Sequence, residues 1–154
     1  MWREQWRRVE RWQARIETRA LSTWVDDPGD EATDDLMAFF SAAWNLRDWL
    51  SNDPASGASA SDVAAFASKS QPLRLAADLS NGEKHLTLTS SREGAGVTGR
   101  SFGVSRDDAG SVVFTGLTWT VTTSDPNENF DAVTLSRDIV TAWRDFFAVT
   151  ALTP

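Results

Sequence analysis

Residues 33–50, which read TDDLMAFFSAAWNLRDWL, decide the fold class of this chain. Apolar side chains recur in this stretch at intervals of three and four residues, and they are Leu36, Phe39, Phe40, Ala43, Leu46 and Leu50. This spacing is typical of a helix that buries one face. Asp34 and Asp35 suit the helix N-terminus, where carboxylates cap free N–H groups and favour the macrodipole, and Pro54 suits the end. The stretch therefore predicts a long helix that buries one face.

Helical patterns continue on both sides of this segment. Residues 2–20 form a basic, Trp-rich pattern, in which Trp2, Trp6 and Trp12 can pack either on a partner subunit or in the core. Residues 62–70 predict a short helix, and Pro72 suits the start of another that reaches about residue 84. Residues 131–150 have a wide apolar face and predict the last helix.

Strand signals are confined to residues 86–123. Residues 113–121, VFTGLTWTV, alternate branched or aromatic side chains with small polar ones, and residues 107–110, DDAG, suit a hairpin turn. Residues 94–99, GAGVTG, are interpreted as a flexible turn because no βαβ unit surrounds them. We predict a mainly α fold in one domain, residues 1–154: a bundle of four to five helices with a β-hairpin inserted before the C-terminal helix.

Composition limits the classes of chemistry that are open to the chain. There is no cysteine and one histidine, so disulfides, thiolate metal sites and cysteine nucleophiles are excluded, and we expect neither a metal nor a cofactor. No apolar run approaches the length needed to span a bilayer, and the charged N-terminus does not resemble a signal peptide. We therefore expect a cytoplasmic protein with no membrane partner.

Charge is unevenly distributed along the sequence. Residues 1–19 hold six arginines and three glutamates, a balance of +3, whereas the whole chain carries −7 and the remainder therefore −10. An acidic body disfavours broad attraction to nucleic acid, although a local basic helix can still contact phosphate. The same acidic body also allows a third kind of function, that of an antitoxin or inhibitor of a basic protein.

The helix that starts at Pro72 carries the candidate functional site. At about 100° per residue, Arg74, Asp78, Asn81 and His85 form one polar stripe beside the apolar face, with Lys84 next to the histidine. Such a stripe can hold polar groups in a fixed geometry. The alternative is an exposed helix face with an ordinary Arg–Asp pair and a surface histidine.

Arg47 adds a second anomaly, because the same helical arithmetic places it in the apolar face of residues 33–50. A charge there requires a carboxylate, a phosphate or solvent. Asp78 is one candidate partner. The alternative is that Arg47 extends past Trp44 to water.

The segment 77–86, ADLSNGEKHL, together with LRDWL at 46–50 and WRDFF at 143–147, resembles a group of uncharacterised bacterial proteins. More distantly, residues 33–150 are similar to the HEPN superfamily of helical domains, many of which are metal-independent ribonucleases of toxin–antitoxin and phage-defence systems. The resemblance implies a homodimer in which His85 is the general acid or base and Asn81 orients the phosphate.

The chain departs from the family motif at one position, since Ser80 stands where the family has arginine. Phosphoryl transfer needs positive charge near the developing oxyanion, and Arg74, Arg47 or Lys84 could supply it, although none of them is at the motif position. Two functions follow from the resemblance. One is a catalytically silent binding module for an RNA or protein partner, and the other is a homodimeric endoribonuclease that uses His85.

Overall fold

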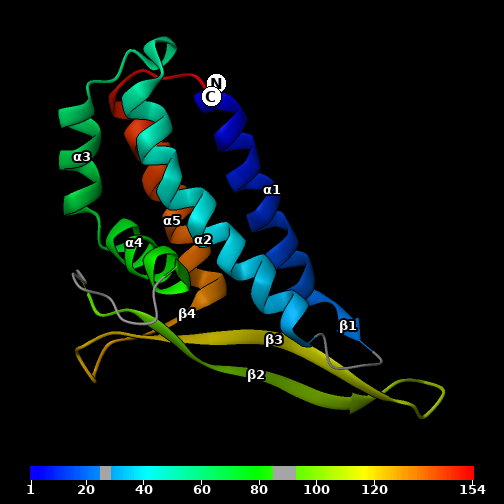
Figure 1. Cartoon of the computed structure of the whole chain (residues 1–154). Helices are drawn as coiled ribbons and strands as arrows, with labels where there is room; N and C mark the ends of the chain where they lie inside the picture. The colour runs from blue at the N-terminus through cyan, green and yellow to red at the C-terminus, as the bar shows by residue number, and fades with distance from the viewer. Residues whose placement is uncertain (25–28, 85–92) are drawn as a thin grey trace.

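The computed structural model describes residues 1–24, 29–84 and 93–154. The helices form a layer over one face of an antiparallel sheet, and the two ends of the chain lie next to each other at the end of the bundle far from the sheet (Figure 1). The prediction of a mainly α fold is confirmed. No helix of the described part of the chain is long and apolar enough to cross a membrane.

The helices follow the periodic segments closely. Within the described ranges they are α1 (Trp2–Leu21), α2 (Gly29–Asn52), α3 (Ala60–Lys69), α4 (Gln71–Lys84) and α5 (Ala132–Val149), with a 3₁₀ turn at Pro54–Ser56 after α2. Helix α2 starts about one turn earlier than the pattern predicts. The added turn belongs to the core, because Ala32 is fully buried.

Helix α2 lies at the centre of the core. Its six predicted apolar residues are all fully buried. The Nε1 of Trp143 in α5 donates a hydrogen bond to the Ala43 carbonyl of α2 at 3.0 Å, which joins the two helices inside the core. Trp2 and Trp6 of α1 lie 5.3 and 5.0 Å from Phe147 of α5, measured between ring centroids. Both tryptophans are therefore core residues of this chain.

The sheet is built around one central strand. Strand β3 (Val112–Thr122) pairs with β2 (Gly96–Arg106) on one side, and with the short strands β1 (Thr23–Trp24) and β4 (Asn129–Asp131) on the other, always antiparallel. The β2–β3 turn is the predicted one, with Gly110 at φ 82° and its N–H bonded to the Asp107 carbonyl at 2.9 Å. The inner side of β3 faces the helices, and Trp119 Nε1 donates to Thr33 Oγ1 of α2 at 3.2 Å.

Two details of the predicted insertion need correction. The hairpin occupies residues 96–122 of the predicted 86–123, residues 85–92 lie outside the described residues, and β4 stands between the hairpin and α5. Residues 94–99 are not one flexible turn, because Gly96 already begins β2 and pairs with Thr122. The hairpin is thus part of a four-stranded sheet that also uses residues before α2.

Candidate functional site

Helix α4 holds the predicted polar stripe in a largely buried setting. Most of the helix faces the core, through Leu73, Leu75, Ala76, Ala77 and Leu79. Pro72 lies in the first turn, as expected. The stripe runs along the border of this buried face, so its polar groups must find partners within the protein.

Asp78 is the most constrained residue of the stripe. Its side chain is fully buried, and Oδ2 accepts hydrogen bonds from the backbone N–H groups of Glu93 at 2.6 Å, Gly94 at 2.9 Å and Ala95 at 3.4 Å. Gly94 adopts φ +67°, the left-handed conformation that turns successive N–H groups toward one acceptor. Asp78 therefore attaches the segment before β2 to helix α4.

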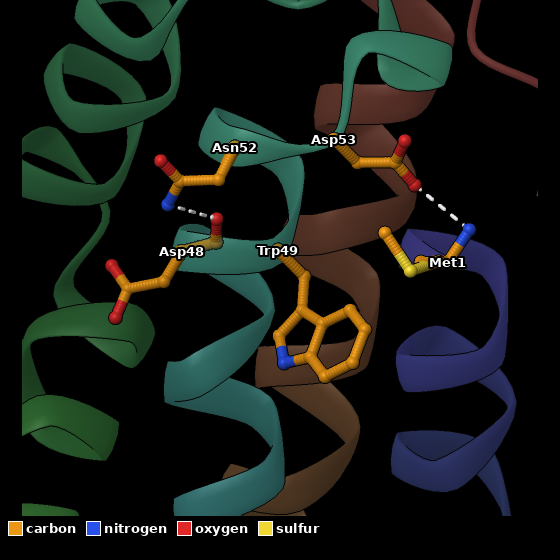
Figure 2. A pocket seen from close by; sticks show the side chains of 5 residues that line it. All are labelled: Met1, Asp48, Trp49, Asn52 and Asp53. Atoms are coloured by element: carbon orange, nitrogen blue, oxygen red, sulfur yellow. Dashed lines mark hydrogen bonds and ion pairs between the residues drawn. The ribbon is translucent and has the colours of Figure 1, made fainter.

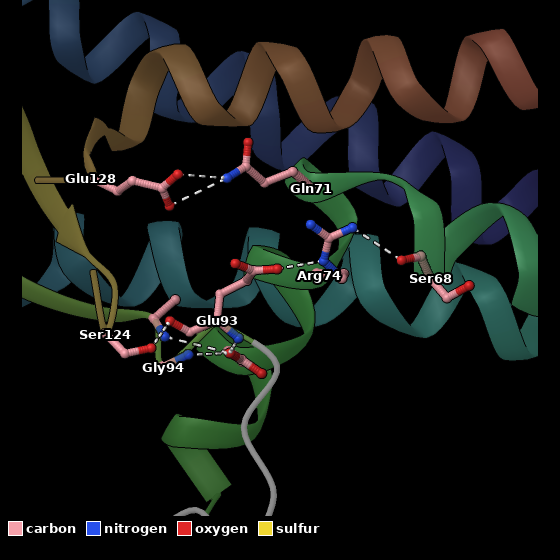
Figure 3. Close-up of polar contacts among 9 residues, drawn as sticks. Ser68, Gln71, Arg74, Glu93, Gly94, Ser124 and Glu128 are labelled. Atoms are coloured by element: carbon pink, nitrogen blue, oxygen red, sulfur yellow. Dashed lines mark hydrogen bonds and ion pairs between the residues drawn. The ribbon is translucent and has the colours of Figure 1, made fainter.

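Arg74 reinforces the same attachment one turn earlier. Its Nε donates to Glu93 Oε1, and its Nη1 donates to the Ser68 carbonyl at 3.0 Å (Figure 3). The Glu93 carbonyl in turn accepts hydrogen bonds from the backbone N–H and the hydroxyl of Ser124, both at 2.8 Å. The Arg74 charge is thus matched by a carboxylate of the chain itself.

The next two positions of the predicted motif differ in burial. Ser80, where the HEPN motif has arginine, is fully buried, and its hydroxyl donates to Ser41 Oγ of α2 at 3.4 Å. Asn81 is half-buried. Close by, a pocket of about 380 Å³ is lined by Met37, Leu79, Gly82, Ala95, Gly96 and Val97. These described lining residues offer apolar side chains and backbone, and none of them is titratable.

Arg47 does not join the stripe. Its Nε and Nη2 donate to Asp48 Oδ1 at 2.9 and 2.7 Å, and its guanidinium lies 4.3 Å from the centroid of the Trp44 ring. The Arg47 side chain is 31% exposed. The interpretation in which Arg47 passes Trp44 to reach solvent therefore describes the structure, and the proposed meeting with Asp78 does not occur.

The predicted stripe ends at Lys84 and His85. Lys84 is the last residue of α4, and His85 lies outside the described residues. The structure thus brings Arg74 and Asp78 together around Glu93, and it separates Arg47 from them.

A second pocket lies where α1 and α2 meet at the far end of the bundle. It measures about 250 Å³ and is lined by Met1, Asp48, Trp49, Asn52 and Asp53 (Figure 2). The hydrogen bond and charge of the Met1 amine, 2.8 Å from Asp53 Oδ2, lower the pKa of Asp53 to about 2, aided by the N–H groups of Trp2 and Ala55. This pair was not predicted from the sequence, where its one signal is Asp53 just before Pro54.

No family model, no curated protein and no solved structure matches this chain. Any function is therefore proposed from the residues and their contacts. The contacts around α4 stabilise the fold. The buried Asp78 carboxylate accepts hydrogen bonds from three backbone N–H groups, and the Arg74 guanidinium pairs with the Glu93 carboxylate.

Proposed function

We propose that this protein is a catalytically silent, HEPN-like binding module, one that holds a partner without cleaving it. The observation that supports the proposal most directly is the bonding of Asp78, a fully buried member of the stripe whose carboxylate accepts N–H groups of the chain itself. A group used in this way fixes the fold of residues 93–95. It does not face a substrate.

The two arginines that could supply positive charge for phosphoryl transfer are both paired with carboxylates of the chain itself. Arg74 is paired with Glu93, and Arg47 is paired with Asp48 and covered on one side by Trp44. A guanidinium that already has a carboxylate partner stabilises a developing oxyanion poorly, because the carboxylate opposes it. Ser80, at the position of the family arginine, is buried and carries no charge.

The resemblance further suggests a cytoplasmic homodimer that acts in phage defence or a toxin–antitoxin system. The central point of the proposal is that the protein does not cleave RNA.

The test compares the wild-type protein with His85→Ala in an RNA cleavage assay. Each protein, at a concentration high enough to populate a dimer, is incubated with end-labelled single-stranded RNA in EDTA and analysed on a denaturing gel. We expect the RNA to remain intact in both samples, as in buffer alone. Cleavage by the wild type that disappears in folded His85→Ala would overturn the proposal and identify a metal-independent endoribonuclease.

A further inference from the structure

The outer side of α1 carries a row of arginines. Arg3, Arg7, Arg8 and Arg11 are all exposed on this side and are called the α1 arginine face below. Glu4 is the acidic residue of the first turn and is also exposed, so these five side chains carry four positive charges and one negative charge. Helix α1 lies at the edge of the helix layer, with its outer side uncovered (Figure 1).

The other charged residues of α1 are directed elsewhere. Glu10 and Glu17 bind arginines of α5, with Arg144 Nη2 at 3.2 Å and Arg137 Nε at 2.7 Å. At the far end of the helix, Arg19 bonds to Asp35 of α2 at 2.5 Å, and Arg15 lies 3.2 Å from the same carboxylate. These carboxylates are paired with arginines outside the α1 arginine face, so the face keeps an excess of positive charge.

Two members of the face are held in place by neutral acceptors. Arg3 Nε donates to the Thr153 carbonyl at 2.8 Å, and Arg8 Nη1 donates to Gln5 Oε1 at 2.9 Å. Gln5 is only 2% exposed, and its own Nε2 is bonded to the Ala42 carbonyl at 2.8 Å. These contacts orient the guanidinium groups and leave their charge intact. Arg7 and Arg11 form no ion pair with any residue of the described ranges.

Aromatic rings lie between the arginines. A pocket of about 240 Å³ is lined by Arg8, Arg11, Trp12 and Arg15, and the Arg15 guanidinium lies 4.7 Å from the centroid of the Trp12 ring. Another pocket on the same face, of about 290 Å³, is lined by Arg3, Trp6, Arg7, Glu10 and Pro154. Both pockets combine guanidinium groups with an indole. The Trp12 indole is partly exposed and the Trp6 indole is only 3% exposed, and the second pocket also holds the Glu10 carboxylate, which is paired with Arg144.

We propose that the α1 arginine face binds the phosphodiester backbone of a single-stranded nucleic acid. Guanidinium groups match phosphate oxygens in charge and geometry, and the partly exposed Trp12 indole provides a surface on which a base can stack. Arg3 and Arg11 are eight residues apart, about 12 Å along the helix, so the face suits several successive phosphates better than one small anion. The acidic remainder of the chain confines the strand to this face.

This inference rests on the proposed binding function and names its surface and the class of its ligand. The test measures fluorescence anisotropy of labelled mixed-sequence RNA and DNA 12-mers with the full chain, at 50 to 200 mM KCl. Four phosphate contacts predict a slope of about −2.8 in log K against log salt, which makes binding about 50-fold weaker across that range. The comparison of affinities for the RNA and the DNA 12-mer shows whether the type of sugar affects binding.

The decisive variant is Arg7→Gln/Arg11→Gln, which removes two exposed charges and keeps good helix-forming residues. We expect the salt slope to fall to about −1.4, and affinity at 50 mM KCl to drop by roughly 50-fold. The matched control is Lys69→Gln/Arg106→Gln, which removes two exposed charges from α3 and the hairpin. Binding by this control should remain close to that of the wild type.

Three outcomes would overturn the inference. They are no binding of either oligonucleotide, equal losses in the two double variants, and binding of poly-glutamate at this face in place of oligonucleotides, which would assign the face to an acidic protein. The RNA is recovered and checked on a gel after each titration. Degraded RNA would contradict the absence of catalysis, while the DNA arm still reports on the α1 arginine face.

Discussion

Replacing Asp78 by alanine removes the acceptor that holds residues 93–95 on α4. The two shorter hydrogen bonds, at 2.6 and 2.9 Å, are charge-assisted and fully buried at the carboxylate. Each such bond contributes about 2 kcal/mol, and the third, at 3.4 Å, adds little. We therefore expect Asp78→Ala to lower the free energy of unfolding by about 4 kcal/mol, and Asp78→Asn, which keeps one carbonyl acceptor, by about half of that.

Urea denaturation followed by tryptophan fluorescence measures the change in free energy. In a chain of this size, about 4 kcal/mol corresponds to a fall in Tm of roughly 10 °C. Hydrogen exchange provides a local measurement, because the amides of Glu93 and Gly94 should lose protection in Asp78→Ala. The matched control is Asp48→Ala, which removes a carboxylate that is 57% exposed and paired with Arg47, and it should cost under about 1 kcal/mol.

The reasoning would be refuted if Asp78→Ala unfolded at the same urea concentration as the wild type, or if the amides of Glu93 and Gly94 kept their protection. Either result would mean that the Asp78 carboxylate does not hold this segment in solution. The support that Asp78 gives to a silent α4 stripe would then be lost.

Two further predictions concern a pair of glycines and a carboxylate. Gly94→Ala should destabilise the fold by about 2 kcal/mol, because φ at this position is +67° and the new Cβ would lie 2.8 Å from Ser124 Oγ. Gly82→Ala should instead stabilise the fold by about 0.5–1 kcal/mol, because Gly82 lies in a helix and a Cβ there meets open space. Thermal melts of the two variants test this difference. The folded-state pKa of Asp53 is about 2, below the ordinary value of 3.8, so its stabilising contribution is complete above pH 4 and declines as the pH falls toward 2. Urea unfolding at several pH values should show wild type more stable than Asp53→Asn at pH 6, and a constant difference down to pH 2 would contradict this assignment.

The five α-helices of the described ranges could be predicted because their signal is local. Each of these segments repeats apolar residues with the helical period, which requires no knowledge of its partners. Strands β1 and β4 left no such signal, since two or three residues cannot show alternation. The pairing of β1 with β3 joins Thr23 to Thr115, which are far apart in the sequence, and only the assembled core brings these two strands together.

The candidate site was predictable in its position and not in its contacts. Helical geometry placed Asp78 correctly at the border of the buried face of α4. The groups that donate hydrogen bonds to Asp78 are backbone N–H groups, which every residue except proline has. The sequence therefore could not identify these donors, and only Gly94 indicated where they lie. The same geometry placed the Cβ of Arg47 in the apolar face. A long side chain can leave that face, and the neighbouring Trp44 ring and Asp48 carboxylate make the exit favourable.

The contact of Trp2 and Trp6 with Phe147 has a consequence for synthesis of the chain. The ring that packs against Trp2 and Trp6 belongs to Phe147, which is synthesised roughly 140 positions later. At ordinary rates of translation, the apolar side of α1 lacks its contact with Phe147 during roughly ten seconds. During that interval the nascent chain exposes two tryptophans to the surrounding medium, which makes α1 the segment that a ribosome-associated chaperone would be expected to protect.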